Sequence, residues 1–171
     1  MPTAFGSRFA AQRAELLKRV ANTGIFKILN DDERHDLLVH GIMHNFNDGD
    51  VIFKEDSTDE KTMYFIVSGE VDIQLEGYKK DGSNTVATLS AGEIFGEMSV
   101  FNDEPRSATI RSKGLSTLLQ LDLDKMMNTP LSSPSSDLTI KILCYIAEGL
   151  CNKLSNMNKV VLHTTAGHPN G

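Results

Sequence analysis

Basic residues, cysteines and long apolar runs are scarce in this sequence, and each shortage excludes a class of protein. The 171 residues include 17 lysines and arginines against 23 aspartates and glutamates, a formal net charge of −6. Nonspecific nucleic-acid binding needs a basic face that releases counterions, so this balance argues against it. Two cysteines, Cys144 and Cys151, form neither a disulfide framework nor a metal-binding pattern, and we expect them to be reduced, buried or half-buried thiols.

Membrane and export signals are also missing. No apolar run reaches the roughly 20 residues of a membrane-spanning helix, and the N-terminus lacks the apolar core of a signal peptide, so we expect a cytoplasmic location. His40 and His44 could share a helix face as metal ligands, but the sequence places no third ligand beside them. We therefore favour exposed or capping roles for both histidines and expect no metal.

The most informative stretch is GEIFGEMSVFNDEPRSATI, residues 92–110. It predicts a strand end, a glycine turn, one short helical turn, a loop and another strand. Gly96 removes the side chain where the backbone must approach something closely, and the amides after it favour an anion. Glu97 can accept a hydrogen bond from a hydroxyl group, and Arg106 can donate two to phosphate oxygens. The set suits a sugar phosphate, with a surface ion pair as the plainer alternative.

This stretch closely resembles the phosphate-binding cassette of the cyclic nucleotide-binding domain family. The family pattern is matched by Phe95-Gly96-Glu97, Pro105-Arg106 and Ser107-Ala108, with a loop length like that of protein kinase A regulatory subunits and, as in the catabolite activator protein, a serine after the arginine. The resemblance implies that Arg106 and the amides of Gly96 to Ser99 hold the cyclic phosphate, and that Glu97 holds the ribose 2′-hydroxyl. The ligand-binding residues that it predicts are Phe95, Gly96, Glu97, Met98, Ser99, Arg106 and Ser107.

The resemblance says less about the base of the ligand. A threonine after the arginine often accompanies guanine in this family, and Ser107 is smaller but also carries a hydroxyl group. We favour cAMP over cGMP. The resemblance further implies that the C-terminal helix, or the loop before it, closes over the base.

Short strand-like segments with glycine turns predict an antiparallel barrel or jelly roll (a double-stranded β-helix) in residues 44–122. Ser68-Gly69-Glu70 is predicted to close a hairpin between two of them. The predicted strands cover residues 51–53, 63–67, 71–75, 85–89, 106–111 and 117–121. Metal-dependent cupin enzymes have a similar barrel, but the sequence has no His-x-His cluster, so we expect no catalysis.

Helices are predicted on both sides of this barrel. Residues 1–43 form an N-terminal helical segment, with one helix over Ser7–Val20 and a short helix that begins at the capping-box-like pair Asn30 and Glu33. The C-terminal helices occupy residues 123–162, and residues 163–171 are predicted to be a frayed tail. The C-terminal part holds a short helix from Asp122 to Met127, a loop rich in serine and proline, and a long helix that is capped by Asp137 and ends near Leu162.

The long C-terminal helix has apolar residues at alternating spacings of three and four, which is the pattern of a heptad seam. The seam consists of Ile140, Leu143, Ala147, Leu150, Leu154, Met157 and Val161. Such a face either packs on its own barrel or pairs with a second copy of the chain. We favour a homodimer through residues 137–162.

Together these features predict a cyclic nucleotide receptor module that reports ligand occupancy through its C-terminal helix. About nine residues follow that helix, too few for a folded DNA-binding domain. We therefore expect no direct DNA binding and an unidentified effector protein as partner, whether the chain stands alone or is part of a longer one. The alternative is a structural or interaction module of the same fold that has lost its ligand, against which Glu97 and Arg106 argue.

Overall fold

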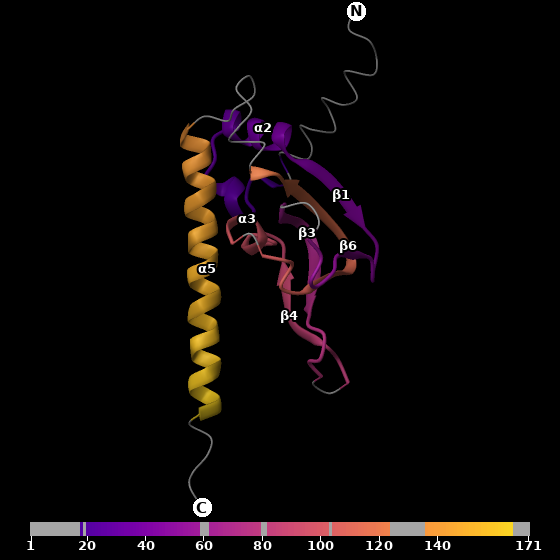
Figure 1. The fold of residues 1–171 in the computed structure, drawn as a ribbon. Helices are drawn as coiled ribbons and strands as arrows, with labels where there is room; N and C mark the ends of the chain where they lie inside the picture. The colour runs from indigo at the N-terminus through magenta and orange to yellow at the C-terminus, as the bar shows by residue number, and fades with distance from the viewer. Residues whose placement is uncertain are drawn as a thin grey trace, which may run out of the picture.

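An antiparallel sheet forms the centre of the protein, with helices beside it (Figure 1). The computed structural model describes residues 18, 20–58, 62–79, 82–102, 104–123 and 136–165. Most of the predicted helix over Ser7–Val20 and most of the one from Asp122 to Met127 lie outside these residues. None of the helices in the described ranges combines the length and apolarity needed to span a membrane.

Six strands make up the sheet in the described part of the chain. Their order is β1-β6-β3-β4, with β2 also paired to β6 and β5 to β3, and every pairing is antiparallel. This confirms the predicted mainly antiparallel β architecture. The strands are β1 (Ile42–Phe46), β2 (Val51–Phe53), β3 (Met63–Gln74), β4 (Thr85–Ser90), β5 (Ile94–Phe95) and β6 (Thr109–Leu121).

The predicted hairpin at Ser68-Gly69-Glu70 is wrong, because β3 continues through these residues. Gly69 has a φ of 86°, and the register of β3 against β6 shifts on both sides of Ser68. The same partner strand continues across the shift, so the feature is a bulge that bends β3 rather than a turn that reverses it. The predicted strands 106–111 and 117–121 are likewise one strand, β6, which begins only at Thr109. Arg106 therefore lies in the loop before β6.

Alternate residues of β3 face two separate cores, which explains its continuous apolar run. Tyr64 and Ile66 belong to an inner cluster of the sheet with Phe95 and Leu118. The other face of β3 packs against the helices. That second cluster includes Met63, Phe65 and Val67 of β3, Ile25, Phe26, Leu37 and Leu38 near the N-terminus, and Leu138, Ile142 and Ile146 near the C-terminus.

The short N-terminal helix predicted to start at Asn30 and Glu33 does so. After η1 (Gly24–Lys27), α2 (Asp31–His40) starts with a complete capping box. The Asn30 side chain accepts a hydrogen bond from the Glu33 amide at 2.9 Å, and the Glu33 carboxylate accepts one from the Asn30 amide at 2.9 Å. These bonds satisfy two amides that the helix itself leaves without partners.

The long helix α5 (Ser136–Thr165) differs from its predicted bounds at both ends. It begins at Ser136, so the predicted N-cap, Asp137, lies in the first turn, where its carboxylate is favoured by the helix dipole. It also continues to Thr165, into the segment predicted to fray. The sequence contains no glycine or proline between Ser136 and Thr165 except Gly149, so little there would end a helix earlier.

The predicted heptad seam is not the face by which α5 packs on its own domain. Leu138, Ile142 and Ile146 make that contact and are 0%, 1% and 2% exposed. Seam residues Leu154 and Met157 are 60% and 64% exposed, and Leu150 packs partly against the core. The side chain of the last seam residue, Val161, lies outside the described part of the structure.

Both cysteines, Cys144 and Cys151, lie on the solvent side of α5 and are exposed. The prediction of buried or half-buried thiols is therefore wrong. The helix packs on its own domain through Leu138, Ile142 and Ile146, and neither cysteine lies among these core residues.

Candidate ligand-binding site

The stretch 92–110 folds in the order that its sequence predicts. Strand β5 pairs with β3 and ends at Phe95, Gly96 turns the chain with a φ of 78°, and α3 (Met98–Phe101) forms one short helical turn. A Cβ atom at Gly96 would lie 2.8 Å from Nη1 of Arg106 and 3.0 Å from the Thr62 carbonyl oxygen. The turn therefore needs a glycine both for its backbone angle and for the approach of the arginine.

Arg106 lies in the centre of the site and is 4% exposed. Its Nη1 donates to the carbonyl oxygens of Thr62 at 2.8 Å and Gly96 at 3.1 Å, and to the Ser99 hydroxyl at 2.8 Å. Its guanidinium carbon lies 4.1 Å from the centroid of the Phe53 ring, a cation–π contact. The positive charge is thus held in a fixed position beneath the first turn of α3.

Glu97 is 3% exposed and precedes α3. Its Oε1 accepts a hydrogen bond from Nζ of Lys153 on α5 at 2.7 Å, and the same ammonium donates to the Ile94 carbonyl oxygen at 3.1 Å. Burial of a carboxylate is costly unless a positive partner and hydrogen bonds offset the lost hydration. Within the described residues that partner is Lys153, from the far end of the sequence.

Of the remaining predicted site residues, two are buried and two are exposed. Ser99 is buried beside Arg106 and donates its hydroxyl proton to the Gly96 carbonyl oxygen at 3.1 Å. Phe95 is 2% exposed, and its ring stacks on Tyr64 in the inner core with centroids 5.2 Å apart. Met98 and Ser107 are exposed and lie beside each other at the surface. The structure therefore gathers Gly96, Glu97, Ser99 and Arg106, and gives the side chain of Phe95 a packing role.

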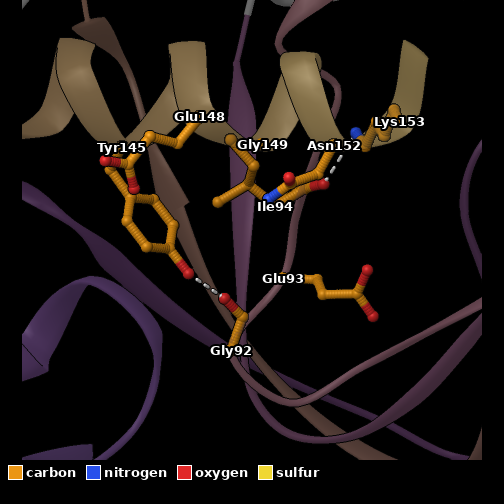
Figure 2. A pocket seen from close by; sticks show the side chains of 8 residues that line it. All are labelled: Gly92, Glu93, Ile94, Tyr145, Glu148, Gly149, Asn152 and Lys153. Atoms are coloured by element: carbon orange, nitrogen blue, oxygen red, sulfur yellow. Dashed lines mark hydrogen bonds between the residues drawn. The ribbon is translucent and has the colours of Figure 1, made fainter. Parts of the chain in front are cut away.

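A cavity of about 190 Å³ lies between α5 and the chain that leads into β5, which also contact each other directly at both ends of it. Figure 2 shows Tyr145 at one end of it and Asn152 and Lys153 at the other. The Tyr145 hydroxyl donates to the carbonyl oxygen of Gly92. Burial raises the pKa of this hydroxyl, and the carboxylates of Glu93 and Glu148 raise it further, so Tyr145 stays a neutral donor. The cavity is lined by Gly92, Glu93, Ile94, Tyr145, Glu148, Gly149, Asn152 and Lys153.

Sequence reasoning missed Tyr145 and Lys153. The sequence shows that Tyr145, Gly149 and Lys153 recur every four residues and so share one face of the helix, but not that this face is turned toward the cassette. A Cβ atom at Gly149 would lie 3.7 Å from the side chain of Ile94. Here α5 passes close to β5, and this closeness is what lets Lys153 reach Glu97.

The described residues offer no group of three or more His, Cys, Asp or Glu side chains placed to hold a metal ion. His44, one of the two histidines considered as ligands, instead has its Nε2 2.6 Å from Oε1 of Gln120 on β6. The site chemistry in this part of the chain therefore consists of an arginine, a carboxylate with its lysine, hydroxyl groups and backbone amides.

Comparisons with known proteins agree with this geometry. The sequence pattern of the cyclic nucleotide-binding domain matches residues 43–129. The cAMP-dependent protein kinase regulatory subunit of Debaryomyces hansenii is 32% identical over 114 residues, which are 67% of this chain and 24% of that protein. The regulatory subunit of Dictyostelium discoideum is 35% identical over 80 residues, 46% of this chain and 24% of that protein. The chain thus spans about a quarter of the length of these relatives.

Solved structures show the same fold. A cyclic nucleotide-binding domain from Methylobacillus flagellatus KT superposes with a TM-score of 0.72 at 22% identity, covering 94% of this chain and 88% of that one. The regulatory domain of Toxoplasma gondii PKA with cAMP gives a TM-score of 0.60 at 17% identity, covering 81% and 51%. The predicted jelly roll with a C-terminal helix is confirmed. The chain belongs to the cyclic nucleotide-binding domain family.

Proposed function

We propose that this chain is a receptor module that binds a cyclic nucleotide, with cAMP favoured over cGMP, and that it catalyses no reaction. The observation that carries the proposal is the meeting of three groups around Gly96: the buried guanidinium of Arg106, the buried carboxylate of Glu97 and the first-turn amides of α3. A positive group and amides suit a phosphate, and a carboxylate beside them suits a sugar hydroxyl.

In this proposal, Arg106 and the amides after Gly96 hold the cyclic phosphate, and the Glu97 carboxylate accepts a hydrogen bond from the ribose 2′-hydroxyl. Among the described residues, Nη1 of Arg106 donates to two carbonyl oxygens and one hydroxyl group, which are neutral acceptors. A phosphate oxygen carries negative charge, so in place of a neutral acceptor it would add the attraction of an ion pair to the hydrogen bond. Ser107 is an exposed further donor at the edge of the cassette.

The preference for cAMP has its support in the relatives. The two relatives described above are cAMP-dependent protein kinase regulatory subunits, and the similar Toxoplasma gondii domain was solved with cAMP. Other relatives are cyclic nucleotide-gated channels and potassium channels, so the same domain occurs with different outputs. We therefore propose an effector protein of unspecified kind, no direct DNA binding and a cytoplasmic location.

Calorimetric titration with cAMP, cGMP and linear AMP tests the proposal. We expect cAMP to bind more tightly than cGMP, and AMP to bind most weakly. Arg106→Met should cost about 3 kcal/mol or more of binding free energy, because it removes a charge-assisted contact to a partly buried phosphate. Arg111→Met is the matched control, since Arg111 contacts Gly49 and Gln74 away from the cassette and should leave affinity unchanged.

A second candidate is a module of the same fold that has lost its ligand. One observation favours it: Glu97 and Arg106 both have partners within the protein itself. Under this alternative the two residues only stabilise the fold. A folded wild-type protein that binds none of the three nucleotides would establish it.

We also propose that α5 carries the output. A ligand can shift the position of a helix only by its differential affinity for the two positions, and α5 contacts the cassette directly through Lys153. The exposed heptad seam of α5 is proposed as the interface of a homodimer, because Ile140, Leu154 and Met157 are at least 57% exposed while another face of the helix packs on the barrel.

A further inference from the structure

We propose that Lys153 is a positioning residue of the nucleotide site. It holds Glu97 by one carboxylate oxygen and leaves the other for the ribose hydroxyl, and it thereby couples ligand occupancy to the docking of α5. This inference rests on the proposed function and adds a residue, from another element, that no sequence pattern of the cassette contains.

The geometry of the ammonium group carries the first step. Nζ of Lys153 has two acceptors in the segment that enters the cassette, Oε1 of Glu97 at 2.7 Å and the carbonyl oxygen of Ile94 at 3.1 Å. Among the described residues, nothing donates a hydrogen bond to Oε2 of Glu97. A hydroxyl group can therefore bind Oε2 without displacing the lysine, so the two donors share the carboxylate.

Charge decides whether Lys153 helps or opposes the ligand. The proposed ligand is an anion, and Lys153 adds one positive unit beside a site that already contains Arg106 and Glu97. In a largely buried site this positive charge attracts the phosphate. A lysine that had to leave before the ligand entered would instead weaken binding.

The packing of α5 fixes the reach of Lys153. Tyr145 donates to the Gly92 carbonyl oxygen two turns earlier in the helix, and Gly149 allows the helix to pass close to Ile94. Figure 2 shows Tyr145 and Gly149 on the side of α5 that faces Gly92 and Ile94, in the chain that leads into the cassette. Glu97 then touches both α5 and the ligand, so each changes the binding of the other by the same factor. The change is favourable in this proposal, because Lys153 and the ribose hydroxyl bind different oxygens of the carboxylate.

The test compares cAMP with 2′-deoxy-cAMP in calorimetric titrations of wild type, Lys153→Gln and Lys153→Arg. We expect Lys153→Gln to weaken cAMP binding about tenfold, less than the loss for a fully buried charged pair, because the Lys153 side chain is 36% exposed. Binding of 2′-deoxy-cAMP should weaken much less, so the ratio between the two affinities falls. Lys153→Arg keeps the charge and should restore the ratio. Lys141→Gln, which alters the other buried α5 ion pair at Glu33, should leave it unchanged.

Two results would overturn the inference while the proposed function stands. Tighter cAMP binding by Lys153→Gln would show that the lysine competes with the ligand, and equal weakening for both nucleotides would show that it does not act through Glu97. A folded wild type that binds no nucleotide would instead overturn the proposed function, and this inference with it.

Hydrogen exchange of the unsubstituted protein gives a second readout that needs no variant to fold. Addition of cAMP should slow exchange of the α5 amides around residues 145–155, because occupancy strengthens the docking of the helix. Unchanged or faster exchange in this segment, with cAMP bound, would contradict the coupling.

Discussion

Gly96 satisfies two separate constraints, a left-handed backbone and a crowded Cβ position. Its φ is 78°, and a Cβ atom would lie 2.8 Å from Nη1 of Arg106. Gly77 in the β3–β4 connection has almost the same φ, 79°, but nothing lies within 4 Å of its Cβ position. Comparing alanine at these two glycines therefore separates backbone strain from steric conflict inside the cassette.

We expect Gly77→Ala to lower the free energy of unfolding by about 1 kcal/mol, the cost of a positive φ for a residue with a side chain. Gly96→Ala should lose at least about 2 kcal/mol, because the new methyl group also displaces Arg106 from its acceptors. Urea unfolding of wild type and both variants measures the losses. If both variants lose the same free energy of unfolding, Arg106 adjusts to the new methyl group without cost, and steric conflict in the cassette does not contribute.

The sequence could predict Gly96, Glu97 and Arg106 because they lie within one short segment, whose spacing is itself the signal. Lys153 could not be found in the same way. It is 56 positions from Glu97, and their contact depends on which face α5 turns to the barrel. Side-chain pairing between distant elements is decided by packing, and local patterns do not contain it.

At the scale of elements, the strands β3 and β6 show why turns and bulges are confused in sequence. A positive φ at Gly69 suits either feature, and the deciding factor is whether the partner strand continues. Here β6 pairs with β3 on both sides of Gly69, so the chain bends without reversing. Short strands such as β2 and β4 were predicted almost to the residue, because ordinary turns bound them.

The ion pair between Glu33 and Lys141 joins α2 to α5. Nζ of Lys141 lies 2.7 Å and 2.8 Å from the two carboxylate oxygens of Glu33. The hydrogen bond from Lys141 lowers the pKa of Glu33 below its ordinary 4.5, and the bond from the Asn30 amide lowers it further. Because the pKa is lower in the folded protein, the pair stabilises the fold above about pH 4.5, and this contribution is lost as the pH falls through the folded-state pKa.

Glu33→Gln should therefore lower the free energy of unfolding by about 1 kcal/mol at neutral pH, where the wild-type carboxylate is charged. The difference from wild type should shrink as the pH falls well below 4.5, since the wild type then also loses the charge. Denaturant unfolding at a series of pH values measures it. Glu76→Gln, at an exposed position, is the control and should differ from wild type by less than about 0.5 kcal/mol throughout. A difference for Glu33→Gln that does not vary with pH would rule out the ion pair as its cause.

For the whole molecule, the main consequence of the fold is that α5 has two separate apolar faces. One face, with Ile142 and Ile146, completes the core beside the N-terminal helices. The other is the seam, which includes Leu154 and Met157. Figure 1 shows α5 running along one side of the domain, with its C-terminal part extending past α3. A helix with both faces can attach to its own barrel and to a second copy at the same time.

The dimer prediction follows from this division of α5. Wild type should sediment as a dimer at high micromolar concentration, because exposed a and d positions of a heptad pattern bury each other in a paired helix. Leu154→Glu combined with Met157→Glu should give a monomer whose own domain is destabilised by less than about 0.5 kcal/mol, since neither side chain packs in the core. Ile142→Ala is the opposite control: this residue is 1% exposed, and its truncation should cost about 2–4 kcal/mol of domain stability.

A dimer should also make the melting temperature of wild type rise with protein concentration, and the double variant should lose that dependence. If wild type sediments as a monomer up to high micromolar concentration, the seam does not form a homodimer. The proposed output of α5 would then have to act within a single chain.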